Sequence, residues 1–194
     1  RKQALKIVLN SFFGTLGYPR FRWYSRESAR AITAWARHYI RDTLAAAEKE
    51  GYPPIYSDTD SAFIQVPAEK GEEEVRAFVE GINKTLSGRM ELEFEGLYKR
   101  GLFVTKKDKK DVRAAKKRYA LADYNDELTI VGFEYVRRDW CLFARQTQKK
   151  VLEEVLVHGS AEKALEIVKQ AVTRLKGGQV PKKELVVLTQ LQRR

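Results

Sequence analysis

The stretch IYSDTDSAFIQV, residues 55–66, places two aspartates in an apolar segment that is typical of β-strands. Strands tend to exclude Asp, and neighbouring carboxylates repel each other, so Asp58 and Asp60 call for a physical reason. Side chains at i and i+2 of a strand share one face roughly 7 Å apart, and a tight hairpin brings them closer. Such a pair resembles part of a hard-cation site that phosphate and water oxygens complete. The alternative is an exposed turn in which Asp58 and Ser61 make only local hydrogen bonds.

The chain is strongly basic: 37 Lys and Arg residues against 26 Asp and Glu give 194 residues a formal net charge of +11. This surplus indicates a polyanionic partner, either nucleic acid or an anionic membrane surface. No apolar run approaches the ~20 residues of a spanning helix, so we expect no membrane insertion. A soluble basic protein such as a ribosome-associated factor is the alternative explanation of the charge.

Cysteine and histidine are too scarce for a zinc finger or ribbon. Cys141 is the single cysteine, and the two histidines, His38 and His158, are far apart in the sequence. Any metal therefore needs oxygen ligands, which suits Mg²⁺ or Mn²⁺. One cysteine allows no internal disulfide, which fits a reducing, cytoplasmic setting.

Hydrophobic periodicity predicts an α+β chain that ends in a helical module from about residue 135. Strands are expected in 55–66 and in 90–105, the latter broken near Gly96 or Gly101, with a short β-hairpin around Tyr124–Asp126. The densest basic run is 106–118. Helices are expected at about 2–14, 26–50, 71–88, 139–158 and 161–176.

The first of these helices carries an unusual polar face. Leu5, Val8, Leu9 and Phe12 follow helical spacing and form its apolar face. On the opposite face, Lys6 is either a point charge for a triphosphate or a solvated lysine. Phe13 on that polar face indicates stacking near a base or packing on a neighbouring lobe. The residues of this face are Lys6, Asn10 and Phe13.

Several segments together resemble family B DNA polymerases of the archaeal type. KIVLNSFFG (6–14) resembles motif B, K-x3-N-S-x-Y-G, and IYSDTDS (55–61) resembles motif C, Y-x-D-T-D-S. KKRY (116–119) is similar to the K-K-x-Y element at the palm–thumb junction, and YVRRDW (135–140) to the thumb entry. ELEFEGLYKRGLFVTKK (91–107) is similar to the archaeal palm, so the resemblance covers essentially the whole chain.

This resemblance implies a partial polymerase palm, an antiparallel sheet with helices, preceded by the last fingers helix and followed by a helical thumb. Residues 1–17 would be the end of the fingers, and 18–104 the palm portion with motif C. Residues 105–194 would hold the palm–thumb junction and part of the thumb.

The resemblance also implies roles for single residues. Asp60 would bridge two Mg²⁺ ions, for which Mn²⁺ can substitute, and Asp58 would be a secondary acid beside them. Lys6 would contact the phosphates of the incoming dNTP, with Asn10 beside it. Weaker candidates near the metals are Glu93, Glu95 and Ser61.

Further residues are implied to contact primer-template DNA. Lys117 and Tyr119 would touch the minor groove and the primer backbone near its growing end, and the other contacts are to backbone. Such contacts hold a duplex without reading its sequence. The supporting residues are Lys116 and Arg118, and those on the duplex backbone are Arg137 and Arg138.

Two departures from the family pattern are a substitution inside motif B and an added stretch between two matched segments. Phe13 replaces the Tyr of motif B, which keeps the ring and loses the hydroxyl, so we expect a modest effect on nucleotide selection. Residues 108–115 look like an extra basic loop, which either adds nonspecific DNA affinity or is merely solvated.

The largest departure is that motif A, D-x-x-S-L-Y-P, and the exonuclease motifs match nowhere in these residues. One bridging Asp does not hold two Mg²⁺ ions, so catalysis is expected only with a partner polypeptide that carries motif A and the exonuclease. The expected assembly is a heterodimer with a large obligate interface. The chain would be either the natural small subunit of a split polymerase or an experimental fragment.

Three classes of function are therefore compared. The first is the C-terminal catalytic portion of a DNA-directed DNA polymerase, which adds dNTPs to a primer 3′ end by two-metal phosphoryl transfer. The second is a non-catalytic DNA-binding or processivity module, which would not require Asp58 and Asp60. The third, a D-x-D glycosyltransferase with Mn²⁺ and a nucleotide sugar, explains neither Lys6 and Asn10 nor KKRY.

Overall fold

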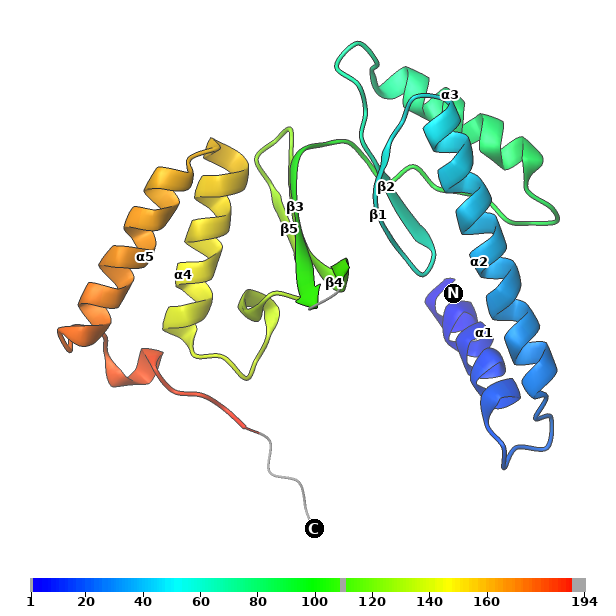
Figure 1. Ribbon diagram of the computed structural model, residues 1–194. Helices are drawn as coiled ribbons and strands as arrows, with labels where there is room; N and C mark the ends of the chain where they lie inside the picture. The colour runs from blue at the N-terminus through cyan, green and yellow to red at the C-terminus, as the bar shows by residue number, and fades with distance from the viewer. Residues whose placement is uncertain (1, 109–110, 190–194) are drawn as a thin grey trace. The chain divides into compact units, whose positions relative to one another are not determined.

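The computed structural model describes residues 2–108 and 111–189 and divides into two compact units, one up to Phe94 and one from Glu95. Helices and small antiparallel sheets are both present, which confirms the α+β prediction. Figure 1 shows the elements of each unit. None of the described helices is both long and apolar enough to cross a lipid bilayer.

The first unit is a two-stranded antiparallel hairpin with three helices. Ser25 caps the second helix, because its hydroxyl oxygen accepts a hydrogen bond from the Ser28 amide at 3.2 Å. Tyr52, just after that helix, is buried and packs against Phe78 of the third helix, with ring centroids 5.0 Å apart. The elements are α1 (Lys2–Gly17), α2 (Arg26–Lys49), β1 (Pro54–Asp58), β2 (Ser61–Ile64) and α3 (Glu72–Thr85).

The core of the first unit is small, and α1 contributes little to it. The predicted apolar residues of α1 are on a helix as expected, yet Leu5, Val8, Leu9 and Phe12 are 56–69% exposed. The core residues come from the end of α2, the hairpin and α3: Ala47, Tyr52, Tyr56 and Val75.

The second unit packs a three-stranded antiparallel sheet, in the order β3-β4-β5, against a helical module. Ala120 and Ala122 of β4 are fully buried beneath Leu152 and Leu156 of the module, and Phe133 completes this cluster. The elements are β3 (Tyr98–Asp108), β4 (Asp111–Asp123), β5 (Leu128–Val131), η1 (Glu134–Val136), α4 (Leu142–Glu153), η2 (Glu154–His158), α5 (Ala161–Lys176) and η3 (Lys182–Glu184).

Two predicted elements differ in the structure. The strand expected over 90–105 begins only at Tyr98, because the Asn83 side chain bonds both the amide and the carbonyl of Leu92, at 2.7 and 3.0 Å. The expected loop at 108–115 is largely strand: β3 and β4 pair through Asp108 and Asp111, and 109–110 lie outside the described residues.

The helix expected over 139–158 is also different. It begins at Leu142, and its last turn widens into the π-helical η2, which ends at Gly159 with φ +70°. Arg100 of β3 donates hydrogen bonds to the carbonyl oxygens of Leu156 and Val157, at 3.1 and 2.9 Å, which satisfies this helix end.

Candidate active site and nucleic-acid interface

Asp58 and Asp60 lie in the tight turn that joins β1 to β2. Asp58 ends β1 and pairs with Ser61, so Thr59 and Asp60 alone make the connection. The main-chain oxygen of Asp58 accepts hydrogen bonds from the Asp60 amide at 2.8 Å and from the Ser61 hydroxyl at 3.0 Å. The turn is thus locally hydrogen-bonded, but Asp58 is buried and not exposed as in the alternative expectation, and the metal-site expectation stays a prediction.

Thr59, between the two acids, has φ +58°. A β-branched residue in the left-handed region is strained, by an amount on the order of 1–3 kcal/mol. Strain of this kind persists where the surrounding structure over-determines a conformation, and it is concentrated at functional sites. The turn therefore holds two carboxylates in an arrangement that its own backbone disfavours.

The two carboxylates have different surroundings. Asp58 is 7% exposed, and the Thr59 hydroxyl donates to its Oδ1 at 3.2 Å, whereas Asp60 is exposed at the tip of the turn. A buried carboxylate beside an exposed one offers oxygen ligands to a hard cation. Among the described residues, however, no three acidic, histidine or cysteine side chains gather to hold a metal ion.

The weaker acidic candidates do not complete such a ligand set in the described structure. Glu93 lies in the irregular stretch before β3, is exposed, and forms no ligand cluster with the turn. Glu95 belongs to the second unit and is exposed as well. The turn therefore fits a divalent cation only as a partial ligand set, to which other donors must be added.

On α1, Lys6 and Asn10 are one helical turn apart and both exposed. Phe13, on the same face, lines a groove of about 330 Å³ between α1 and the start of α2. Its side chain is 41% exposed, and both expected roles, stacking near a base and packing on a neighbouring lobe, stay predictions. The groove is also lined by Gly17, Tyr24, Arg26, Ala29, Arg30 and Thr33.

The KKR residues of KKRY form a bulge in β4. The ladder passes from the pair Phe103–Tyr119 to the pair Thr105–Ala114, so Val104 stands opposite four residues. We call residues 115–118 the basic bulge. Lys116 and Lys117 are exposed, and Lys117 has φ +58°. Bulges of this kind redirect side chains away from the sheet pattern.

Gly132 provides the space for this bulge. It has φ +69°, and a Cβ built on it would lie 1.7 Å from the carbonyl oxygen of Lys117. No other residue type fits at such a distance, because real Cβ contacts stay beyond 3.0 Å. The sequence alone did not indicate Gly132 as a functional position, since glycines between strands are common.

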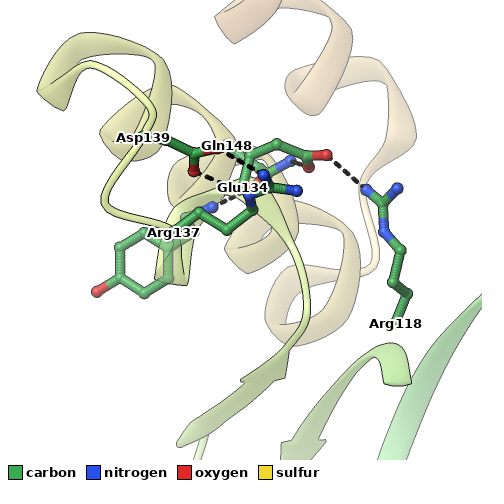
Figure 2. A network of polar contacts seen from close by, with 6 residues as sticks. Arg118, Glu134, Arg137, Asp139 and Gln148 are labelled. Atoms are coloured by element: carbon green, nitrogen blue, oxygen red, sulfur yellow. Dashed lines mark hydrogen bonds and ion pairs between the residues drawn. The ribbon is translucent and has the colours of Figure 1, made fainter. Parts of the chain in front are cut away.

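Arg118, the last residue of the basic bulge, is tied to the helical module (Figure 2). It donates a hydrogen bond to Glu134 Oε1 at 2.7 Å, and Gln148 of α4 donates to Glu134 Oε2 at 2.7 Å. The Gln148 hydrogen bond, with help from Arg118, holds the pKa of Glu134 below its ordinary value. Sequence reasoning missed both Glu134 and Gln148.

Arg137 is paired within its own segment (Figure 2). Its guanidinium donates two hydrogen bonds to the Asp139 carboxylate, at 2.9 and 2.5 Å, which lower the pKa of Asp139 and raise the pKa of Arg137. The adjacent Arg138 is exposed. Tyr119, which follows the basic bulge, packs against Phe103 with centroids 5.9 Å apart.

Comparison with known proteins gives a match over the whole chain. The model of the family described as DNA polymerase family B matches residues 1–194. A DNA polymerase from Thermococcus gorgonarius is 43% identical over 197 residues, which cover 100% of this chain and 24% of the relative. A DNA polymerase from Methanocaldococcus jannaschii is 44% identical over 186 residues, 94% of this chain and 11% of the relative. The chain thus spans about a quarter or less of these curated relatives.

Proposed function

The chain belongs to DNA polymerase family B, and from this premise we propose that it forms the C-terminal catalytic portion of a DNA-directed DNA polymerase. In this proposal it takes part in the template-directed addition of dNTPs to a primer 3′ end. The observation that carries the proposal is the strained two-residue β1–β2 turn, which has Asp58 at its start and Asp60 at its tip.

The chemistry of phosphoryl transfer needs positioning and charge stabilisation more than covalent participation by the protein. Two Mg²⁺ ions, when bound, stabilise the attacking and leaving oxygens of an in-line displacement. Asp60, exposed at the tip of the turn, is proposed as the carboxylate that reaches both ions. Asp58 is proposed to hold the turn and to add negative charge beside them.

The remaining roles follow the positions of the basic side chains. Lys6 and Asn10 are exposed on one face of α1, where they are proposed to contact the triphosphate of the incoming nucleotide. Lys116 and Lys117 of the basic bulge, with Tyr119 and Arg138, are proposed to contact primer-template backbone. Contacts to phosphate bind DNA of any sequence, as template-directed synthesis requires.

A second polypeptide segment is part of this proposal. The described residues bring together only two carboxylates at the turn and no third metal-ligating side chain. We propose that a partner polypeptide with motif A supplies the other bridging carboxylate and completes the palm sheet next to the β1–β2 hairpin. The hairpin is a two-stranded sheet in the described structure, and a sheet of this size is stabilised when further strands are added to it.

Primer extension with Mg²⁺ tests the proposal in three arms: this chain, the motif-A-bearing polypeptide, and their mixture. We expect extension by the mixture only. Asp60→Ala should lower the rate by at least about a thousandfold, because the lost carboxylate stabilises charge at the reacting phosphoryl group. Asp42→Ala, which removes an exposed carboxylate from α2, is the matched control and should leave the rate unchanged.

Two results would contradict the proposal in different ways. Rapid extension by this chain alone would remove the need for the partner. Undiminished extension by an Asp60→Ala mixture would remove the assignment of the turn. If the chain binds primer-template DNA tightly while Asp60→Ala has no effect, the alternative is supported: a non-catalytic DNA-binding or processivity module that uses the basic bulge.

A further inference from the structure

We propose that Glu134 is a positioning residue, which fixes the basic bulge to helix α4 so that Lys116 and Lys117 meet the phosphates of bound DNA. This inference rests on the proposed function, because it assumes that the basic bulge contacts DNA. Glu134 is negatively charged, so it would act on DNA binding through Arg118 and not through a contact of its own with phosphate.

The sheet alone does not determine the direction of the basic bulge. The β3–β4 ladder skips from Tyr119 to Ala114, and the β4–β5 ladder ends at the pair Tyr119–Val131. The regular register of the two ladders thus skips residues 115–118. A segment of this kind needs tertiary contacts to take one conformation, since each ordered residue loses about 1–2 kcal/mol of backbone entropy.

Glu134 supplies such a contact by using both of its carboxylate oxygens. Oε1 accepts from Arg118 in the basic bulge, and Oε2 accepts from Gln148 in α4, each at 2.7 Å (Figure 2). The Glu134 side chain is 19% exposed, so solvent screens these contacts less than at an open surface.

The α4 end of this connection is itself fixed. Gln148 Oε1 accepts a hydrogen bond from the Tyr135 amide at 2.6 Å, and Arg145 donates to the Tyr135 carbonyl oxygen at 2.7 Å. Two α4 side chains thus hold the peptide groups that follow Glu134. The carboxylate is therefore held by the helix, and Arg118 is held by the carboxylate.

Arg118 keeps its hydrogen bond to Glu134 although this position leaves part of its guanidinium without a hydrogen-bond acceptor in the described part of the chain. Its Nε is buried and has no hydrogen-bond partner among the described residues, an arrangement that costs about 1–3 kcal/mol. Its guanidinium lies 5.4 Å from the ring centroid of Phe133, which with Glu134 offsets this cost. Arg118 therefore links the basic bulge to α4, and the supporting DNA contact that the family resemblance implies for it stays a prediction.

The direction in which loss of Glu134 changes DNA affinity separates a positioning role from simple electrostatics. Removal of a negative charge near bound DNA should strengthen binding, because DNA is a polyanion. If Glu134 only neutralised Arg118, its removal would also free Arg118 to contact phosphate. If Glu134 positions the basic bulge, its removal should weaken binding although the chain becomes more positive.

The experiment measures the affinity of the 194-residue chain for a primer-template duplex by fluorescence anisotropy, at NaCl concentrations from about 50 to 300 mM. We expect Glu134→Gln to weaken binding about fivefold and to lower the slope of log K against log salt by about 1, as for one lost phosphate contact. Gln148→Met, which changes no charge, should shift both readouts in the same direction. Glu153→Gln removes an exposed acid from α4 and should not weaken binding.

The same data set separates the inference from the proposed function. Lys117→Gln should lower the salt slope by about 1, and if it does not, the basic bulge is not a DNA contact and the proposed function loses that part. If Lys117→Gln acts as expected but Glu134→Gln tightens binding or leaves it unchanged, the positioning role is wrong. Thermal unfolding by circular dichroism checks that each variant is folded, and if Glu134→Gln is not, Gln148→Met decides by the same two readouts.

Discussion

At the scale of single residues, Thr59 is a β-branched residue in the left-handed backbone region, which such residues rarely adopt. Its φ of +58° suits Asn better, because Asn tolerates the left-handed region. We expect Thr59→Asn to raise the free energy of unfolding by about 0.5–1 kcal/mol, net of the weak hydroxyl contact to Asp58 that it loses. Differential scanning calorimetry measures the change.

The control for this prediction is the same substitution at an extended strand position. Thr129 of β5 is exposed, and Thr129→Asn should destabilise the chain slightly because Asn is depleted in strands. If Thr59→Asn destabilises as much as Thr129→Asn does, the backbone at Thr59 is not strained.

Glu134 gives a second prediction at this scale, through pH. Because the Gln148 hydrogen bond and the Arg118 charge lower its pKa in the folded chain, the ionised form stabilises the fold above the ordinary glutamate value of 4.5. That stabilisation is lost as the pH falls through the lower, folded-state pKa. The protonated side chain then resembles Gln, so the stability difference between wild type and Glu134→Gln should shrink below pH 4.5.

Urea unfolding at a series of pH values from neutral downward measures this difference. Other carboxylates titrate in both proteins alike, so their effects cancel in the comparison. A difference that stays constant down to the acid limit of the folded state would show that ionisation of Glu134 adds nothing to the stability of the fold.

The sequence pointed to the motif-bearing residues but not to the side chains that contact them. Asp58 and Asp60 stand out in the sequence because strands tend to exclude Asp. Lys6 and Asn10 are grouped by helical spacing, which places them on one face. The bond between Arg118 and Glu134 joins residues 16 apart, and the one between Glu134 and Gln148 joins residues 14 apart across a 3₁₀ turn. No periodicity encodes such pairings, because they depend on how the sheet packs on α4.

At the scale of elements, Gly132 is the position where β5 leaves room for the basic bulge. Gly132→Ala should destabilise the second unit by about 3 kcal/mol or more, because the new Cβ overlaps the Lys117 carbonyl in addition to the unfavourable positive φ. Hydrogen exchange of the β4 and β5 amides measures the loss.

Gly178 is a matched control in the same unit. It has a similar φ of +68°, and a Cβ built on it meets nothing within 4 Å. Gly178→Ala should therefore cost only about 1–2 kcal/mol, the penalty of the positive φ. Equal losses for the two variants would mean that β4 moves away from Gly132 at little expense, and that the basic bulge is not rigid.

Elements were predictable where one local signal dominates. The helix expected at 161–176 is α5 with the same bounds, because Ser160 caps it and Gly177 and Gly178 follow it. Strand 90–105 was wrong in its first half, since the side chain of Asn83, in a different element, takes the backbone groups of Leu92. Residues 108–115 were expected to form a loop because they look like an addition to the family pattern, yet the backbone pairing of β3 and β4 extends into them.

At the scale of the whole molecule, the exposed face of α1 shows what a sequence pattern can and cannot establish. Helical periodicity predicted that Leu5, Val8, Leu9 and Phe12 share one face, and they do. The pattern does not say what covers that face, and the described residues leave it more than half exposed. Because the chain spans 24% or less of the relatives described above, we propose that the partner polypeptide covers it.

This proposal predicts that Val8→Asp acts on association and not on the fold. Val8 is 62% exposed, so the change should alter the stability of the isolated chain by no more than about 0.5 kcal/mol. In the complex, an unpaired carboxylate on a buried apolar face should weaken association with the motif-A-bearing polypeptide at least about tenfold. Gln3→Asp, which adds the same charge on the opposite face of α1, should leave association unchanged.

Sedimentation velocity of the mixture measures the affinity, and calorimetry of the isolated chain measures stability. If Val8→Asp weakens association no more than Gln3→Asp does, the apolar face of α1 is not the surface that the partner covers.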